Sequence, residues 1–309
     1  MVDQPARGSH RRIGVERRVF VSVTSTRTLD DRRREVKAAI LDRITKAGYA
    51  PQEFWESGIA ENLAWNFENV HAVMQRCVGA VVIGFPRWTV RQDSVETGLV
   101  GDFNHYEGAV AITLGLPVML IAEQNVEGRV IVWNGAGKSI TDLPNDAGPD
   151  WVTSAEFEKR FGAWQRELGL RRDVFLGYCS RSAGLAAQIQ LRLERLGATV
   201  LNWAMDFTAG ASILGELEEA SGRCSSGVFL FTEDDPLEGG AGIAAPRDNV
   251  VFEAGHFMAT KGATRCLIIR EGAAKMPADV GGAIYVSLAK GGDAGAIEGR
   301  LRDFLESNL

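Results

Sequence analysis

The fold is decided by residues 228–269, VFLFTEDDPLEGGAGIAAPRDNVVFEAGHFMATKGATRCLII. The apolar run at 228–231 is typical of a buried strand, and the run at 266–269 predicts a second one. Between them, residues 249–261 carry apolar side chains at helical spacing, and Gly262 follows. Two buried strands joined through a helix are expected to lie parallel in one sheet, because only a long crossover connects parallel strands.

The same alternation continues through the rest of the second half. A Gly-rich loop is expected from Glu238 to Ala245, and Gly197 is expected to stop an earlier helix. The other expected elements are strands at 174–178, 199–203 and 284–286, helices at 185–196 and 211–220, and a terminal helix through Leu301 and Leu305.

The first half alternates in the same way. Asp30 or Asp31 is expected to cap the first helix, which Gly48 stops. Residues 134–150 are rich in Gly, Asn, Asp and Pro and are expected to form a loop. Thr153 with Glu156 predicts a capping box for the next helix. The other expected elements are strands at 19–23, 80–85, 118–121 and 130–132, and helices at 63–76 and 104–114.

Strict alternation predicts an α/β fold with two parallel-sheet domains in tandem, both flavodoxin-like. The 309 residues suffice for two self-contained cores. We expect a flexible basic N-terminus at 1–17, α/β domains at 18–150 and 172–309, and a connecting helix at 151–171. Ligands of such sheets bind beyond the carboxyl ends of the strands, so site residues are sought in the loops that follow strands.

Composition narrows the class of protein. A net charge of −6 disfavours a nucleic-acid partner, and no apolar run reaches the length of a membrane span. The four cysteines form no Cys-x-x-Cys pair and sit in apolar runs, which predicts buried thiols and a cytoplasmic location. The four histidines show no ligand spacing, so no metal site is expected.

The two halves also echo each other around a glutamate. Asn249 and Glu253 begin a helix after a strand and a loop, and Asn104 and Glu107 do the same in the first half. A carboxylate among apolar neighbours marks a functional site, but a solvated glutamate favoured by the helix dipole explains the same pattern.

The segment Arg247–Phe257 resembles the TIR-like domains of bacterial anti-phage effectors of the CBASS and Pycsar type. Arg247, Asn249, Glu253 and Gly255 stand where that family has an Arg-x-Asn-Val-x-x-Glu-x-Gly-x-Phe run. The loop at 232–235 and the stretch 276–282 are similar to the family as well. The resemblance extends from Asp173 to Leu309.

This resemblance implies NAD⁺ glycohydrolysis with Glu253 as the catalytic carboxylate and NAD⁺ as substrate, without a further cofactor. The carboxylate must be ionised to stabilise an oxocarbenium-like ribose, so its pKa is not expected to be raised far. The resemblance also implies self-association into a homo-oligomer and a small nucleotide activator. Candidate substrate-binding residues are Tyr178, Ser180, Arg181, Trp203, Asp206, Phe207, Arg247 and Asn249.

The first half resembles a divergent TIR domain or a nucleoside deoxyribosyltransferase around Asn104 and Glu107, a possible second site. It is expected to serve as a sensor or assembly module. Two alternatives stay open. Glu107 could be the nucleophile of a nucleoside or nucleotide N-glycosidase or deoxyribosyltransferase, or the TIR-like half could be a scaffold that only assembles.

Overall fold

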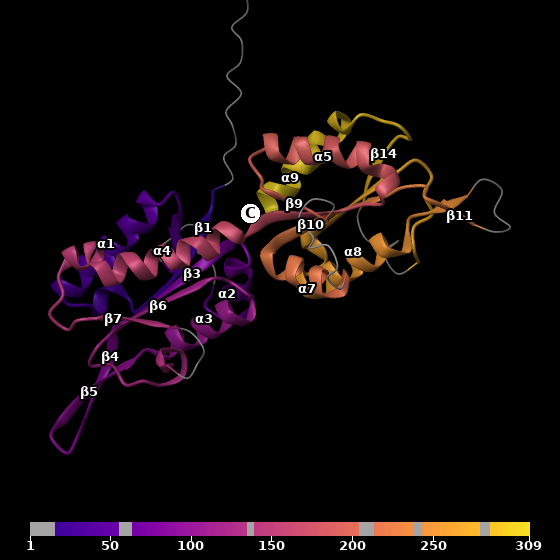
Figure 1. Ribbon diagram of the computed structural model, residues 1–309. Helices are drawn as coiled ribbons and strands as arrows, with labels where there is room; N and C mark the ends of the chain where they lie inside the picture. The colour runs from indigo at the N-terminus through magenta and orange to yellow at the C-terminus, as the bar shows by residue number, and fades with distance from the viewer. Residues whose placement is uncertain (1–15, 56–63, 135–138, 204–212, 238–242, 279–284) are drawn as a thin grey trace, which may run out of the picture. The chain divides into compact units, whose positions relative to one another are not determined.

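The computed structural model describes residues 16–55, 64–134, 139–203, 213–237, 243–278 and 285–309 (Figure 1). The chain divides into two compact units, which we call the N-terminal unit (16–171) and the C-terminal unit (172–309). Residues 1–15 of the predicted basic segment at 1–17 lie outside the described residues.

The N-terminal unit is built on a parallel sheet, whose central strand β3 is buried along its whole length. Helices α1 and α4 pack on one face of this sheet, and α2 and α3 pack on the other. Within the described residues the strand order is β2 (Ala50–Gln52), β1 (Arg18–Val23), β3 (Cys77–Gly84), β6 (Val118–Glu123) and β7 (Ile140–Leu143). The helices are α1 (Asp31–Lys46), α2 (Phe67–Met74), α3 (Asp102–Thr113) and α4 (Ala155–Leu170).

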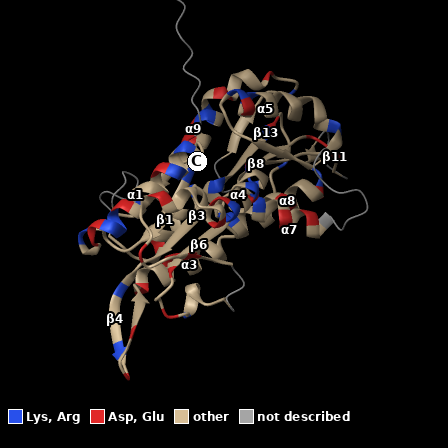
Figure 2. Ribbon diagram, turned by 60° about the vertical axis from the view of Figure 1, so that its left-hand side comes forward, with Lys and Arg blue, Asp and Glu red and all other residues tan. Residues whose placement is uncertain are grey.

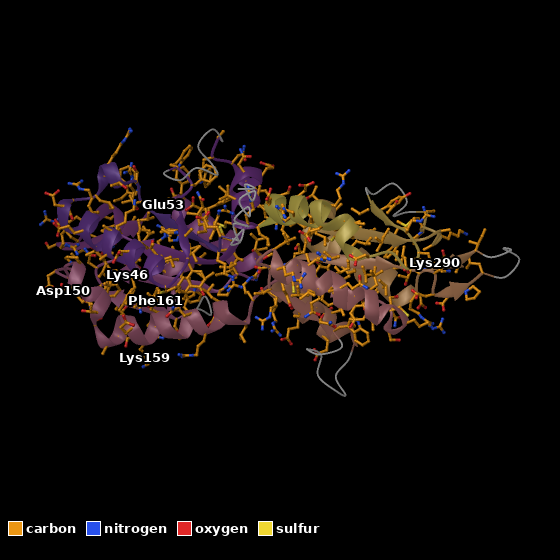
Figure 3. All side chains as sticks on the ribbon, turned by 90° about the horizontal axis from the view of Figure 1, so that it is seen from above. Lys46, Glu53, Asp150, Lys159, Phe161 and Lys290 are labelled. Carbon is orange, nitrogen blue, oxygen red and sulfur yellow. The ribbon has the colours of Figure 1, made fainter. Side chains whose placement is uncertain are left out.

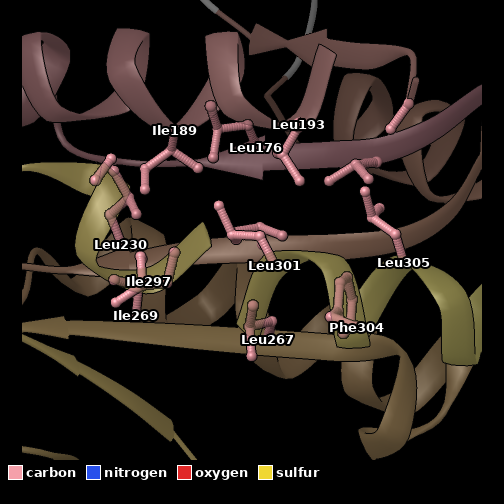
Figure 4. Packing of buried hydrophobic residues seen from close by; sticks show 14 of the residues in the cluster. Leu176, Ile189, Leu193, Leu230, Leu267, Ile269, Ile297, Leu301, Phe304 and Leu305 are labelled. Atoms are coloured by element: carbon pink, nitrogen blue, oxygen red, sulfur yellow. The ribbon is translucent and has the colours of Figure 1, made fainter. Parts of the chain in front are cut away.

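The C-terminal unit has the same layers. Helices α5 and α9 cover one face, where Ile189 and Leu193 of α5 lie above Leu301 of α9 (Figure 4), and α7 and α8 cover the other. Its described strands follow the order β14 (Tyr285–Leu288), β13 (Cys266–Glu271), β10 (Cys224–Phe231), β8 (Arg172–Gly177) and β9 (Val200–Asn202), all parallel. The helices are α5 (Ala183–Arg195), α7 (Ile213–Arg223), α8 (Asp248–Lys261) and α9 (Glu298–Asn308).

The predicted fold class is confirmed, because both sheets have the flavodoxin-like order in which the second strand of the chain lies outside the first. In the N-terminal unit, the helix that follows β1 covers one face of the sheet and the helix α3 that follows β3 covers the other. In the C-terminal unit, the helices that follow β8 and β10 likewise cover opposite faces. A ligand crevice is expected at the carboxyl ends of each of these strand pairs.

Several local predictions are confirmed. Asp30 caps α1 by accepting a hydrogen bond from the backbone N–H of Arg33. Gly48 and Gly197 adopt φ angles of 87° and 97° just beyond their helices, a conformation that favours glycine. All four cysteines are free and buried.

No helix in the described part of the chain is both long and apolar enough to cross a membrane.

Other local predictions are wrong. The run Val130–Val132 forms a short 3-10 helix instead of a strand, with Val130 at a φ of 49°. Its Ile131 and Val132 are apolar because they pack beside α3. The fifth strand of the sheet is β7, within the expected loop; it is only four residues long, carries the polar Thr141 and Asp142 between Ile140 and Leu143, and lies at the sheet edge. Helix α4 is capped by Ser154 and not by the predicted Thr153; the Ser154 hydroxyl accepts a hydrogen bond from the backbone N–H of Phe157.

The sequence pattern also missed an antiparallel hairpin of strands β4 (Pro86–Gln92) and β5 (Val95–Val100), which projects from the N-terminal unit (Figure 1). The side chains of the described residues are shown on the ribbon in Figure 3. Acidic and basic residues are interspersed along α1 (Figure 2).

Candidate active site

Glu253 lies in the second turn of α8, at the margin of the face that packs on the sheet. Val250, Ala254 and Phe257 on that face are fully buried, which sets the rotation of the helix. The Glu253 side chain points at the backbone of Gly177, the last residue of β8. A Cβ placed on Gly177 would lie 2.7 Å from Oε2 of Glu253. The carboxylate therefore occupies the carboxyl end of β8, at the predicted crevice.

The Oε2 atom of Glu253 is buried and has no hydrogen-bond partner among the described residues. Burial alone raises the pKa of Glu253 to about 7. The expectation that this pKa would not be raised far is therefore wrong, because no described cation or donor offsets the desolvation of the carboxylate. A buried carboxyl oxygen without a partner costs folding free energy, so its presence favours a functional role.

The two arginines predicted to bind substrate come from different loops but contact the same carboxylate, that of Asp235. Nη1 of Arg247, which begins α8, lies 3.4 Å from Oδ2 of Asp235. Nη1 of Arg181 lies 3.9 Å from Oδ1 of Asp235 and donates to the carbonyl of Asp234 at 2.6 Å. The Cys179 thiol and then Asp235 raise the pKa of Arg247. The loops after β8 and β10 are thus tied to the start of α8.

Comparison with known proteins assigns this unit to a family. Residues 173–290 match the family described as "CAP12/Pycsar effector protein, TIR domain". The C-terminal unit contains a TIR domain of this family. The predicted family resemblance is confirmed over that segment.

Curated relatives are similar to this chain over about a quarter to a third of its length. CD-NTase-associated protein 12 from Sphingobacterium faecium is 28% identical over 116 residues, which is 37% of this chain and 35% of that protein. Its namesake from Flavobacterium daejeonense is 30% identical over 113 residues, 36% of each chain. The uncharacterized protein YuaY of Escherichia coli K12 is 31% identical over 87 residues, 26% of this chain and 28% of its own. The similarity thus spans about a third of each CD-NTase-associated relative.

Among solved structures, a putative sugar binding protein from Salmonella typhimurium LT2 covers 94% of this chain and 87% of its own at 10% identity. Its TM-score is 0.25, which is too low to inform the fold. The architecture therefore rests on the strand order and packing described above.

The structure places the other predicted residues of the TIR domain in different surroundings. Tyr178 packs in the core on the face opposite Glu253, and its hydroxyl donates to Oδ1 of Asn202 at 2.9 Å. Trp203 is half-buried and donates from Nε1 to the carbonyl of Tyr178 at 3.2 Å, so its indole lies at the end of β8. Asn249 is exposed at the start of α8.

Three predicted positions in the TIR domain have no described side-chain contact. Ser180 is exposed in the turn after β8. Asp206 and Phe207 lie outside the described residues. The roles of these residues in binding stay predictions.

A second buried glutamate occupies the corresponding place in the N-terminal unit. Glu107 of α3 accepts hydrogen bonds from the Ser22 hydroxyl at 2.6 Å and from Nε1 of Trp65 at 3.0 Å. Asn104 donates from Nδ2 to Oγ of Ser22 at 2.9 Å, and the Thr24 hydroxyl lies 3.4 Å from Oδ1 of Asn104. The predicted pair Asn104 and Glu107 therefore belongs to one buried network.

The two glutamates face equivalent backbone positions. Ser22 pairs with Val82, the sixth residue of β3, and Gly177 pairs with Phe229, the sixth residue of β10. The N-terminal unit thus supplies a hydroxyl where the TIR domain has only a hydrogen atom. This exchange leaves the Glu253 carboxylate without the donor that Glu107 receives. Aligning VFVS at 19–22 with VFLG at 174–177 could have revealed the exchange from sequence.

A third buried glutamate provides a contrast. Glu123 ends β6, has a fully buried side chain, and lies 2.8 Å from Nη2 of Arg33 and beside Arg32. Two cations neutralise its charge, as in an ordinary structural ion pair. Of these three glutamates, only Glu253 has a buried oxygen that lacks a partner among the described residues.

Proposed function

We propose that the TIR domain cleaves the bond between nicotinamide and ribose in NAD⁺, with Glu253 as the catalytic carboxylate. One observation carries the proposal. The Oε2 atom of Glu253 is buried without a described partner at the crevice of a parallel sheet, within a segment that matches a TIR effector family.

The reaction suits a single carboxylate. The C1′–N bond of NAD⁺ breaks with its electron pair going to nicotinamide, which leaves as a neutral pyridine and requires no general acid. Positive charge then develops on the ribose, and a nearby carboxylate stabilises it more strongly than it stabilises the substrate. Water adds to C1′ and releases its proton, so the products are nicotinamide, ADP-ribose and a proton.

The pKa of about 7 fits this role in the presence of substrate. The nicotinamide ring of NAD⁺ carries a positive charge, and an opposite charge nearby lowers the pKa of a carboxyl group. Binding of NAD⁺ therefore favours the ionised form of Glu253 at the point where it is needed. A preformed donor like Ser22 would instead spread the carboxylate charge before the reaction begins.

We also propose that the chain is an anti-phage defence effector whose activity depends on self-association and on a small nucleotide activator. This proposal is supported by the effector family of the TIR domain and by the relatives, which are named for association with a CD-NTase. Depletion of NAD⁺ in an infected cell would be the consequence of activation.

The experiment measures nicotinamide release from NAD⁺ by the purified full chain, over a protein concentration series with and without a crowding polymer. Glu253→Gln keeps the shape of the side chain and removes its charge. Glu107→Gln makes the same change in the N-terminal unit and is the matched control. We expect Glu253→Gln to lose about 100-fold or more in rate, and Glu107→Gln to retain activity.

Two results would contradict the proposal. One is NAD⁺ cleavage that persists in Glu253→Gln. The other is an assembled wild-type chain, identified by light scattering, that releases no nicotinamide. Turnover of nucleosides that is lost only in Glu107→Gln would instead support the alternative N-glycosidase or deoxyribosyltransferase.

A further inference from the structure

The N-terminal unit contains a cavity of about 680 Å³ at the carboxyl end of its sheet. Val23 at the end of β1 lines it, together with Asn104 and Glu107 of α3. The cavity therefore opens at the strand pair where a flavodoxin-like sheet binds its ligands. Its volume lies within the range of small-molecule sites.

Aromatic side chains surround this cavity while remaining open to solvent. Trp55 is 61% exposed, Trp88 is 60% exposed and Phe103 is 56% exposed, and all three line the cavity. Leaving such large apolar rings in water is unfavourable, and grouping them around one opening favours a planar ligand. A nucleobase stacks on rings of this kind whatever its identity.

The same cavity carries groups that recognise phosphate. Arg27 and Arg87 line it, and the Arg87 guanidinium lies 5.3 Å from the centre of the Trp88 ring. Of the acidic residues on the wall, Glu53 (labelled in Figure 3) is offset by Lys37, whose Nζ lies 2.6 Å away. Asp102, at the start of α3, is a further acid on the wall.

The buried end of the cavity carries polar side chains, Glu107 and Asn104, that suit ribose hydroxyls. Glu107 is held by Ser22 and Trp65, and Asn104 is held by Ser22, so both side chains keep one orientation. A carboxylate oxygen accepts more than one hydrogen bond, so Glu107 retains acceptor capacity for hydroxyl donors. Burial raises the pKa of Glu107, and the hydrogen bonds from Ser22 and Trp65 partly offset that rise. Both of its oxygens already accept a hydrogen bond, whereas Oε2 of Glu253 has no described partner, so Glu107 is less available for attack on a sugar carbon.

We propose that this cavity binds a nucleoside phosphate and leaves its N-glycosidic bond intact. The base stacks against Trp88 and the neighbouring rings, the phosphate meets Arg87 and Arg27, and the ribose hydroxyls donate to Glu107. The cavity is thus a second nucleotide site, distinct from Glu253 of the TIR domain.

The test uses the full chain carrying Glu253→Gln, so that the proposed NAD⁺ cleavage and its failure do not affect the result. Titration calorimetry is run with nucleoside mono-, di- and triphosphates, with adenosine, and with inorganic phosphate. We expect at least one nucleoside phosphate to bind with a Kd below about 1 mM and more tightly than adenosine or phosphate. Trp88→Ala and Arg87→Ala should each weaken that binding by about tenfold or more.

Two control substitutions match the pocket variants. Arg91→Ala changes an exposed arginine on the same strand as Arg87, and Trp133→Ala removes another exposed tryptophan of this unit; neither residue is among the described lining. Both should leave the Kd unchanged. The proposal is overturned if no nucleoside phosphate binds, or if binding is equally strong in Trp88→Ala and Arg87→Ala.

Chromatography of the incubated nucleotides tests whether the bond stays intact. Intact nucleotide is the expected result. Release of free base by the Glu253→Gln chain that disappears when Glu107→Gln is added would overturn this part of the proposal, because it would make Glu107 a catalyst.

Discussion

The charge on Glu253 should reduce the stability of the TIR domain at neutral and higher pH. The folded carboxyl group has a pKa of about 7, raised by burial from an ordinary 4.5. It therefore keeps its proton through a range in which the unfolded chain has lost it. The stabilisation associated with this proton is complete below about pH 4.5, falls as the pH rises through the folded pKa, and is absent above about pH 7.

The magnitude follows from the size of the pKa shift. A difference of about 2.5 pH units at ~1.4 kcal/mol each sets a ceiling of ~3.5 kcal/mol. The side chain is half-buried, so solvent screens part of this cost, and we expect about 1–3 kcal/mol. Glu253→Gln does not titrate. The free energy of unfolding of Glu253→Gln, relative to that of the wild type, should therefore rise between about pH 4.5 and pH 7. Above about pH 7 this difference should stay constant.

The assay is urea unfolding of the full chain from about pH 5 to pH 8, combined with hydrogen exchange of peptides from α8 and β10 to follow the TIR domain alone. Glu218→Gln, which removes an exposed carboxylate of α7, is the control. Parallel stability curves for the wild type and Glu253→Gln would contradict this prediction. A Gln variant less stable than the wild type at pH 8 would do the same, since it would reveal a donor for the carboxylate.

Three further predictions concern the two glutamates. Gly177→Ala places a Cβ 2.7 Å from Oε2 of Glu253 and 2.6 Å from Cδ1 of Phe229. The rate of NAD⁺ cleavage should therefore fall by about 100-fold, and urea unfolding should show a loss of about 1–3 kcal/mol in the free energy of unfolding. Turnover at the wild-type rate would contradict this geometry. Ser22→Ala leaves Oε2 of Glu107 without its donor and should cost about 1–3 kcal/mol in the same measurement, whereas an unchanged midpoint would mean that water replaces the hydroxyl. In a pH–rate profile, kcat/KM for NAD⁺ should fall about tenfold per pH unit below about pH 7 and level off above it, and a flat profile would exclude Glu253 as the titrating group.

Local sequence patterns predicted most of the architecture. Apolar runs marked the strands of both parallel sheets except β2 and β7, and helical spacing with Gly48 and Gly197 beyond the ends marked the helices. These signals are reliable because an element that buries one face has apolar residues at regular spacing along its own sequence. They failed for β7, since an edge strand with polar residues resembles a loop, and for Val130–Val132, where three apolar residues suit a strand or a packed turn equally well.

Strand and helix periodicity are local properties of the chain, so the sequence alone placed Glu253 near the start of a helix at the carboxyl edge of a parallel sheet. How that carboxylate differs from Glu107 became visible in the three-dimensional packing. The difference lies in what faces each side chain, a hydroxyl 85 positions away for Glu107 and the bare backbone of Gly177 for Glu253. Desolvation and hydrogen bonding act through space, so the state of each glutamate is set by contacts that no local pattern encodes.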